Sequence, residues 1–457
     1  MRSIKPIEAA RLTEISVKRL PRDPGPAGWN ALLPPPAPPV RLEGKQTADW
    51  LVIGAGFAGL AAARRLSQIC PGDCITVLEA KRVGEGPAGR NSGFMIDLPH
   101  DLSSDDYGGA VASDVAQTEN NRAAIAFARA MAEDFDLPQE AFSPVGKING
   151  AATASGESRN RSYAAHLSAM GEGFRLLDAD EMREITGLTY YRSGLFTPGT
   201  AMIQPAMFVR GVANGLRSNR LGVYEESPVV RLERDKDWIA TTPSGEVRAP
   251  RVILAVNGHL NSFGFSKGRL MHVFTYASMT RELSPQEHRR LGGQPDWGIT
   301  PADPMGTTVR RISGTGGDRL VVRNRFTYDP SMEVNDRRIE RVGKDHDRAF
   351  RARFPMLKDV EMEFRWGGRL CLSLNGVQVV GELDEGLFSA CCQNGLGTTK
   401  GTLAGMVAAD LATGVYSPAA RRSADAPAPR RLPPEPLSRI GATMRLRWGE
   451  ICAGREL

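Results

Sequence analysis

A glycine-rich turn between an apolar strand and an alanine-rich helix is the feature that most constrains this chain. Residues 50–60 read Trp-Leu-Val-Ile-Gly-Ala-Gly-Phe-Ala-Gly-Leu, and a second apolar run over 74–78 leads to Glu79. Gly54 permits the tight turn, Gly56 lets the backbone approach a pyrophosphate, and Gly59 lets the helix pack against the strand. The helix opens onto the phosphates with its positive dipole end and unpaired N–H groups. The pattern predicts a dinucleotide-binding βαβ unit.

The acid that ends the unit indicates the adenosine part of such a ligand. The Glu79 carboxylate can accept hydrogen bonds from both ribose hydroxyls, and we expect its neighbours to lie against the same ligand. A glycine-rich turn alone occurs in many proteins without a ligand, whereas strand, helix, strand and acid together are specific. The residues expected to contact the dinucleotide here are Gly54, Gly56, Phe57, Ala58, Gly59, Glu79, Ala80 and Lys81. This unit does not by itself distinguish FAD from NAD.

A second glycine-dense segment follows the acid directly. Residues 84–95 read Gly-Glu-Gly-Pro-Ala-Gly-Arg-Asn-Ser-Gly-Phe-Met, which is too poor in side chains to form core. Its N–H groups are free to face a flat polar ring system or a pyrophosphate. A flexible surface loop is the alternative that composition leaves open.

This segment resembles the "GaSGRNgG" loop of the D-amino-acid oxidase superfamily, closest to the branch with gamma-glutamylputrescine oxidoreductase, glycine oxidase and sarcosine oxidase. The resemblance implies FAD as the cofactor and a flavin-contacting role for Arg90, Asn91, Ser92 and Gly93. Ala88 stands where the family usually has Ser, so one hydroxyl contact is missing.

The resemblance extends over most of the chain. It implies that Val229 and Val230 bracket adenine, and that Ala255, Asn257 and Gly258 return toward the cofactor. It also implies that Gly395, Leu396, Gly397, Thr398 and Thr399 form the closing flavin-binding turn before an apolar helix over 403–411. That turn places helix N-terminal N–H groups where the electron-rich end of a reduced flavin sits.

The expected fold class is α/β and α+β, with a Rossmann-like FAD-binding domain interleaved with a mixed-sheet substrate domain. The FAD-binding domain is expected over residues 48–97, 201–261 and 373–416, and the substrate domain over 98–200 and 262–372. The first substrate segment opens with a helical stretch over 123–134, and the second has strand-like runs at 272–276 and 320–322. Residues 1–47 and 417–457 are expected to be proline-rich, basic terminal arms.

The implied activity is oxidation of the C–N bond of an amine or amino acid by hydride transfer to the flavin, followed by hydrolysis of the imine. Candidate catalytic residues are His272 and Tyr276, four apart on one strand, together with His259, Lys400 and Arg365. Each is also compatible with a purely structural role. Relatives that oxidise small amino acids hold the carboxylate with an Arg after a Trp/Gly segment. Here Leu370 takes that position, which places Arg369 on the opposite strand face.

Composition narrows the cellular setting. The six cysteines show no zinc or disulfide spacing, so we expect small buried residues in a reducing cytoplasm and no metal. Neither a signal peptide nor a transmembrane run is expected. The net charge of +6 lies in the arms: residues 1–47 hold eight Lys/Arg against four Asp/Glu, and residues 417–457 hold the same numbers. The body is then 6 − 8 = −2, which argues against nucleic acid as a partner.

The arms themselves suggest docking segments. Residues 33–39, Leu-Pro-Pro-Pro-Ala-Pro-Pro, predict a polyproline II strap. Leu437, Ile440, Met444, Trp448 and Ile451 recur at helical spacing and predict a basic amphipathic helix. Docking of its apolar face on the body or on a partner subunit is favoured over a membrane surface. We expect neither arm to take part in catalysis.

Two other functional classes stay open on sequence alone. A flavin monooxygenase shares the dinucleotide unit, although no second GxGxxG follows a strand. A flavoprotein subunit of a hetero-oligomeric dehydrogenase is the other.

Gly56→Val is expected to yield colourless protein, because the new side chain would occupy the place where the pyrophosphate approaches the backbone. The measurement is the flavin absorbance and stoichiometry of the purified variant. Normal yellow colour would contradict the assignment of the βαβ unit.

Overall fold

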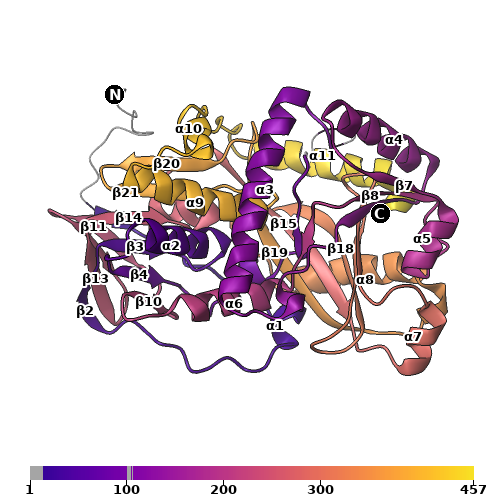
Figure 1. Cartoon of the computed structure of the whole chain (residues 1–457), viewed down its shortest axis with the longest axis horizontal. Coiled ribbons are helices and arrows are strands. Elements are labelled where there is room, and N and C mark those ends of the chain that lie inside the picture. The colour runs from indigo at the N-terminus through magenta and orange to yellow at the C-terminus, as the bar shows by residue number, and fades with distance from the viewer. Residues whose placement is uncertain (1–13, 100–103, 105–106) are drawn as a thin grey trace.

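The computed structural model describes residues 14–99, 104 and 107–457. Two lobes, each built around a large sheet, lie on either side of α3 (Val111–Asp134), which runs down the middle of the view in Figure 1. The chain passes between the lobes more than once, so each sheet is assembled from segments that are distant in sequence.

The first lobe holds the six-stranded sheet that contains the glycine-rich turn. Its order is β10 (Leu221–Tyr224), β4 (Ile75–Leu78), β3 (Trp50–Ile53), β14 (Arg251–Leu254), β21 (Leu387–Cys391) and β20 (Val379–Asp384). Neighbours are parallel from β10 to β21, and β20 pairs antiparallel with β21. The two strands of the βαβ unit are buried along their whole length, as expected for a parallel sheet covered on both faces.

Alternate side chains of this sheet enter two different cores. Val52 and Val77 pack under α2 (Phe57–Ile69) and α9 (Thr399–Thr413). Leu51 and Val252 face a second sheet of five strands on the other side. That sheet has the order β1 (Glu14–Ser16), β11 (Arg231–Arg234), β12 (Trp238–Thr241), β13 (Gly245–Ala249) and β2 (Gly44–Thr47). The lobe is therefore a three-layer structure.

The second lobe is built on a mixed sheet of eight strands. Its order is β19 (Met362–Ser373), β15 (Leu270–Thr280), β18 (Arg319–Tyr328), β17 (Thr308–Ile312), β16 (Trp297–Pro301), β6 (Lys147–Ala151), β8 (Ser193–Thr197) and β7 (Arg175–Leu177). All pairs are antiparallel except β16 with β6. The strand-like runs at 272–276 and 320–322 are confirmed, and so is the predicted α/β and α+β fold class.

The helices of the second lobe are α4 (Ala154–Ala169), α5 (Ala179–Thr186), α7 (Pro285–Leu291) and α8 (Asp336–Arg353). The connecting elements are α1 (Gly28–Ala31), α6 (Pro205–Leu216), α10 (Pro418–Ala424), β5 (Phe94–Met95), β9 (Ala201–Met202), and the 3₁₀ turns η1 (Pro87–Gly89), η2 (Gln139–Ala141), η3 (Asn257–Phe263), η4 (Pro355–Leu357) and η5 (Gly454–Glu456). No helix in the described part of the chain is both long and apolar enough to cross a membrane.

The helix expected over 123–134 is confirmed, but α3 begins much earlier, at Val111. Its first turns are rich in Ser, Thr and Asn, which are weak helix formers, so local propensity does not reveal them. Tertiary contacts hold them instead. Asp114, Thr118 and Asn121 are buried, and the Asn121 amide donates to Asp97 O at 2.9 Å.

The part of the N-terminal arm that precedes the predicted strap lies in the interior of the molecule. Trp29 is fully buried; its indole N–H donates to Asn91 O at 2.8 Å, and its ring meets Trp366 edge-on at 6.5 Å. Its own carbonyl accepts from the Gln204 amide at 2.7 Å. Residues 27–33 therefore belong to the core of the molecule, between the glycine-dense loop and β19.

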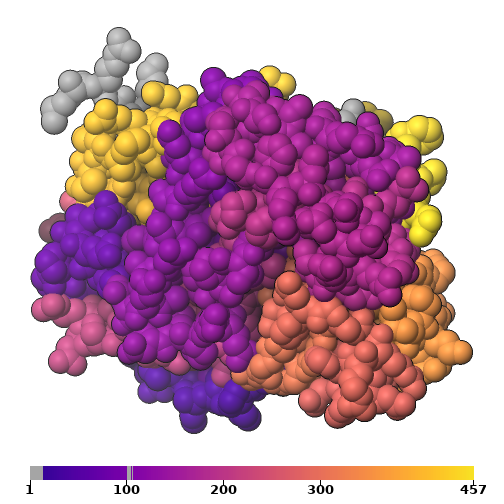
Figure 2. Space-filling view, turned by 45° about the vertical axis from the view of Figure 1, so that its right-hand side comes forward, coloured from indigo at the N-terminus to yellow at the C-terminus, as the bar shows by residue number. Residues whose placement is uncertain are grey.

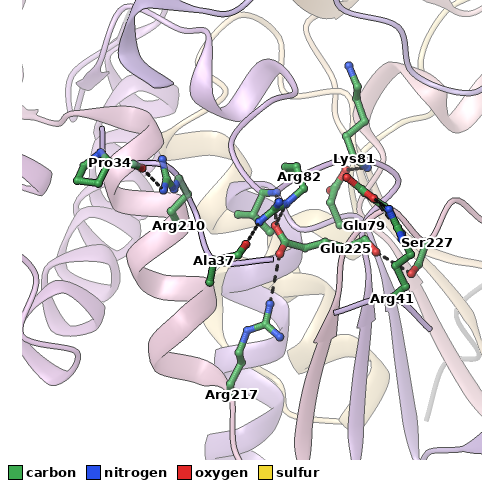
Figure 3. Close-up of polar contacts among 12 residues, drawn as sticks. Pro34, Ala37, Arg41, Glu79, Lys81, Arg82, Arg210, Arg217, Glu225 and Ser227 are labelled. Carbon is green, nitrogen blue, oxygen red and sulfur yellow. Dashed lines mark hydrogen bonds and ion pairs between the residues drawn. The ribbon is translucent and has the colours of Figure 1, made fainter. Parts of the chain in front are cut away.

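The proline-rich residues that follow are held as a strap by side chains of the first lobe (Figure 3). Arg210 donates to Pro34 O at 2.9 Å, and Arg82 donates to Ala37 O. Glu225 lies beneath the strap and pairs with Arg82 at 3.3 Å and Arg217 at 3.6 Å. Since a polyproline segment leaves its carbonyls unpaired within itself, these arginines supply the missing donors.

The C-terminal helix is confirmed as α11 (Leu437–Ala453). The prediction that its large apolar stripe docks on the body is wrong. Ala442 and Leu446 pack on the body, against a cluster that includes Phe326 and Tyr328. The apolar stripe of Met444, Trp448 and their neighbours points outward, with Trp448 70% exposed. The cysteines also divide differently from expectation: Cys371, Cys391 and Cys392 are buried, whereas Cys74 and Cys452 are exposed.

Trp29→Ala is expected to lower the free energy of unfolding by about 3–5 kcal/mol, because it leaves a cavity and removes the bond to Asn91 O. The matched control Trp448→Ala changes an exposed side chain and should shift stability by no more than about 0.5 kcal/mol. Denaturant unfolding of both variants tests this. Equal stability of the two variants would contradict the integral role of the arm.

Candidate functional site

A long cavity connects the two lobes. It is lined at one end by Glu79 and Val229 of the first lobe, and at the other by His272 and Tyr276 of the eight-stranded sheet. Its interior offers about 230 Å³ of space to the centre of a water molecule. The glycine-rich turn and the glycine-dense loop line the stretch between the two ends. Its elongated course past the carboxyl ends of β3 and β4 suits an extended dinucleotide.

Each of the three glycines of the turn is required for a different structural reason. Gly54 has φ +105°, a conformation that favours glycine. A Cβ on Gly59 would lie 1.7 Å from Gly54 O, so Gly59 serves the packing of α2 on the turn. A Cβ on Gly56 would meet only Ala88 Cβ, at 3.5 Å, and Gly56 lines the cavity. The protein itself leaves room for a side chain at Gly56, which indicates that a ligand sets the requirement there.

The start of α2 offers an anion site beside Gly56. No side chain caps this end of the helix, and both Phe57 and Ala58 line the cavity. The unpaired N–H groups of a first helical turn bind phosphate readily. This geometry fits the pyrophosphate of a dinucleotide.

Glu79 is held rigidly at the end of β4. One carboxylate oxygen accepts from Ala55 N–H at 2.8 Å and the other from Lys81 N–H at 3.0 Å. Burial raises the pKa of this carboxyl, and the backbone donors act in the opposite direction. Carboxylate oxygens can each accept further hydrogen bonds, so ribose hydroxyls fit this position.

The glycine-dense loop is locked by its own side chains rather than mobile. The Asn91 amide donates to Ala88 O and its oxygen accepts from Gly93 N–H at 2.8 Å. The Arg90 guanidinium donates to the carbonyls of Glu85, Pro24 and Gly25. Because its N–H groups are taken up by these carbonyls, Arg90 positions the loop, and its burial lowers the pKa of the guanidinium.

Most of the predicted cofactor residues line the cavity, and some do not. Those on the lining are Gly54, Gly56, Phe57, Ala58, Glu79, Ala80, Lys81, Arg90, Asn91, Ser92, Val229, Ala255, Asn257, Gly258, Gly395 and Gly397. Those behind it are Gly59, Gly93, Val230, Leu396, Thr398 and Thr399. The last group supports the wall: the Thr398 hydroxyl donates to Phe94 O at 2.6 Å, and Leu396 packs in the cluster that contains Phe94.

Three of the five catalytic candidates meet at the far end of the cavity. His259, His272 and Tyr276 all line it. The Tyr276 hydroxyl is 2.6 Å from the Thr327 hydroxyl, and His272 Nε2 is 3.1 Å from the Asn261 amide. Burial, followed by the charge of Arg369, lowers the pKa of His259 to about 3 and that of His272 to about 4. Both imidazoles are neutral near pH 7.

The other two candidates lie elsewhere. Arg365 is on β19 and turns toward α8, where it donates to Gly343 O and pairs with Asp347, both at 2.8 Å. Lys400 is in the first turn of α9 and does not line the cavity. Spacing along the chain placed both near the closing turn. Arg365 shares a strand face with Arg369 but lies further along β19, against α8, and Lys400 is not part of the cavity wall.

The prediction that Arg369 faces away from the substrate is wrong. Its guanidinium lines the cavity, contacts His259 Nε2 and pairs with Asp23 at 3.0 Å. Asp23 comes from the N-terminal arm and its side chain is fully buried. Arg19, Leu20 and other residues of the arm also line the cavity, so the arm forms part of the site.

Arg323 was not among the sequence candidates. It lies on β18 within the run Leu-Val-Val-Arg-Asn-Arg-Phe and lines the cavity together with Tyr276 and Ala277. An arginine inside a largely apolar strand is a signal that sequence reading could have used. Asp23 offered no comparable signal, because its role depends on where the arm lies.

Acid should destabilise the protein through the two cavity histidines. Their folded pKa values lie below the ordinary 6.5, so between pH 6.5 and about 4 the unfolded chain binds more protons. Stability is then complete above pH 6.5 and falls with acidification, by up to about 1.4 kcal/mol per pH unit for each histidine. Denaturant unfolding at several pH values should show that the free energy of unfolding of His259→Asn/His272→Asn falls less steeply as the pH is lowered. An equally steep fall in the variant and the unsubstituted protein would contradict the neutral state of both rings.

Comparisons with known proteins agree with this geometry. The model of the DAO family, FAD dependent oxidoreductase, matches residues 49–411. Gamma-glutamylputrescine oxidoreductase of Escherichia coli (strain K12) is 26% identical over 374 residues, covering 80% of this chain and 84% of that protein. The probable oxidoreductase OrdL of Rhizobium meliloti (strain 1021) is 26% identical over 410 residues, covering 86% and 90%.

Solved structures show the same fold. Glycine oxidase from Geobacillus kaustophilus superposes with a TM-score of 0.66 at 18% identity, covering 82% of this chain and 96% of that one. L-Amino acid deaminase from Proteus myxofaciens gives 0.65 at 15% identity, covering 83% and 93%. With the family match spanning most of the sequence and the dinucleotide cavity in place, the chain belongs to the DAO family of FAD-dependent oxidoreductases.

Proposed function

We propose that this protein oxidises the C–N bond of an amine that also carries an anionic group, such as a carboxylate. The names of its relatives, a gamma-glutamylputrescine oxidoreductase and a glycine oxidase, support an amine or amino acid as the reacting class. Arg323 supports the anionic group. The domain division, the cytoplasmic location and any oligomer or partner of the arms remain predictions.

The residues present fit FAD. Gly56 leaves backbone open to a pyrophosphate, Glu79 presents a fixed carboxylate to a ribose, and the locked loop over 84–93 provides a rigid wall for the ring. The chemistry that bound FAD supplies is acceptance of a hydride from the carbon next to the nitrogen, which leaves an imine for water to hydrolyse.

The protein's own part at this end of the cavity is electrostatic. Arg323 contributes positive charge, the charge of Arg369 is paired with that of Asp23, and His259 and His272 are neutral. Such a field disfavours a bound ammonium and lowers the pKa of the substrate amine. The amine is thereby held in the neutral form, whose nitrogen lone pair is available for C–N oxidation.

Arg323 is the observation that carries the proposal. Within the described residues no carboxylate forms an ion pair with it, whereas Arg369 is already paired with Asp23. Its guanidinium lies 4.6 Å from the centre of the Phe326 ring. Burial lowers its pKa to about 10, which still leaves it charged at neutral pH. A half-buried guanidinium with no anion beside it is unfavourable, and an anionic substrate group would complete its pairing.

Arg323→Met is expected to weaken use of an anionic amine by about 1.5–3 kcal/mol in kcat/KM, roughly 10- to 150-fold, because a charge-assisted hydrogen bond is lost. Arg323→Lys keeps the charge and should therefore retain part of the activity toward the anionic amine. The measurement is anaerobic flavin reduction with matched pairs, for example 4-aminobutanoate against butylamine and glycine against methylamine. In each active pair, the substitution should lower kcat/KM only for the carboxylated amine. An equal loss for both members would contradict the role of Arg323 without touching amine oxidation itself.

The same experiment separates the other functional classes. An amine oxidase or dehydrogenase loses its flavin colour with an amine alone. Reduction by NAD(P)H and not by any amine would identify a monooxygenase, and reduction by neither would identify a subunit that depends on a partner.

A further inference from the structure

The C-terminal helix α11 carries two apolar faces, and only one of them is used by the fold. The inner face holds Ala442, Leu446 and Ala453, and Leu446 packs with Phe326 and Tyr328 of β18. Glu450 adds an ion pair with Arg325 at 2.7 Å. These contacts account for the attachment of α11 to the body. The outer face contributes nothing to it.

The outer face is a continuous apolar stripe. Its five residues and their exposed fractions are Leu437 60%, Ile440 52%, Met444 67%, Trp448 70% and Ile451 72%. Steps of three and four residues place them on one side of a helix, a half-turn away from Ala442, Leu446 and Ala453. Other exposed large apolar side chains of the described residues are scattered over the chain. The C-terminal segment, in yellow, reaches the outer surface at the right-hand edge of Figure 2.

The exposed charges of α11 are positive, although Arg439 pairs with Glu435, just before the helix, at 3.8 Å, and Arg447 pairs with Glu450 at 2.7 Å. The exposed residues of α11 include Arg439, Arg445 and Arg447, and none is acidic. The sole acid of the helix, Glu450, is buried and paired with Arg325 and Arg447. Arg445 and Arg447 flank the stripe on its two sides, where long side chains can reach past an apolar surface to anionic groups.

These charges distinguish a bilayer from a second copy of the chain. Residues 417–457 hold eight arginines against four acids, so two copies packed stripe to stripe would bring two net positive segments together, and like charges oppose association. An anionic bilayer surface supplies phosphates to the arginines and an apolar boundary to the stripe. A tryptophan at the level of the headgroups suits the same environment.

We propose that α11 attaches the protein to the surface of an anionic bilayer, lying parallel to it with its outer stripe in the boundary between headgroups and acyl chains. The attachment is peripheral, since the helix is fixed to the body by its inner face. The occupant is the lipid surface itself, without a partner protein.

Vesicle binding of the full-length flavoprotein tests this. We expect co-sedimentation with vesicles of equal phosphatidylglycerol and phosphatidylcholine, at least about tenfold weaker binding to pure phosphatidylcholine, and weakening by salt. Trp448 serves as a reporter, because the other five tryptophans are at most 3% exposed. Acrylamide should quench Trp448 in free protein and lose access when anionic vesicles are added.

Ile440→Ser/Met444→Ser keeps the reporter and should reduce vesicle binding about tenfold or more, since both side chains enter the apolar boundary. Val40→Ser is the matched control, because Val40 is 50% exposed on the N-terminal strap. It should bind vesicles normally. Both variants replace exposed side chains, so flavin content and unfolding should match the unsubstituted protein and separate a binding defect from misfolding.

Three results would overturn the proposal. The first is the absence of binding to anionic vesicles. The second is equal binding by Ile440→Ser/Met444→Ser and the unsubstituted protein. The third is a dimer in vesicle-free sedimentation whose Trp448 is already shielded from acrylamide and which Ile440→Ser/Met444→Ser converts to a monomer. That result would assign the stripe to an interface between copies of this chain.

Discussion

The position of the cofactor cavity depends on a contact between α2 and the turn before it. A Cβ on Gly59 would lie 1.7 Å from Gly54 O, and a Cβ on Gly405 would lie 2.0 Å from Ala58 O. Absence of side chains at these points lets α2 settle against both the turn and α9. The N-terminus of α2 is then held at the carboxyl edge of the sheet, where its free N–H groups face the cavity. Any larger residue would move the anion site away from Glu79.

The second requirement is a rigid wall opposite that anion site, and a distant segment supplies it. Carbonyls of Pro24 and Gly25 accept from Arg90, and Trp29 donates to Asn91 O. A loop with so many glycines loses much backbone entropy when it becomes ordered. Hydrogen bonds and the buried indole of the arm offset that cost. The arm therefore forms part of the cavity and of its support, although it precedes the matched family segment 49–411.

Burial decides the electrostatics at the reactive end. Desolvation and Arg369 together keep His259 and His272 neutral, so the charges that remain there are those of guanidinium groups and of Asp23. Arg369 and Asp23 compensate each other, so the proposed function assigns the anionic group of the substrate to Arg323. A guanidinium suits this role because it stays charged where a histidine has lost its proton.

The sequence by itself determined the features whose parts lie close together along the chain. The βαβ unit, the glycine-dense loop, the closing turn and the helical periodicity of 437–451 could all be predicted, because local spacing dictates local geometry. Tertiary structure alone decided what depends on segments far apart. Asp23, His259 and Arg369 meet although more than three hundred residues separate the first from the last, whereas Arg365 is held against α8 and Lys400 does not line the cavity. The docking of α11 is a further example. Its small inner residues, including Gly449, where a Cβ would lie 2.9 Å from Met305 Cγ, allow a close approach to the body. The larger apolar stripe, which sequence amphipathicity favoured for docking, remains outside because close packing selects shape as well as hydrophobicity.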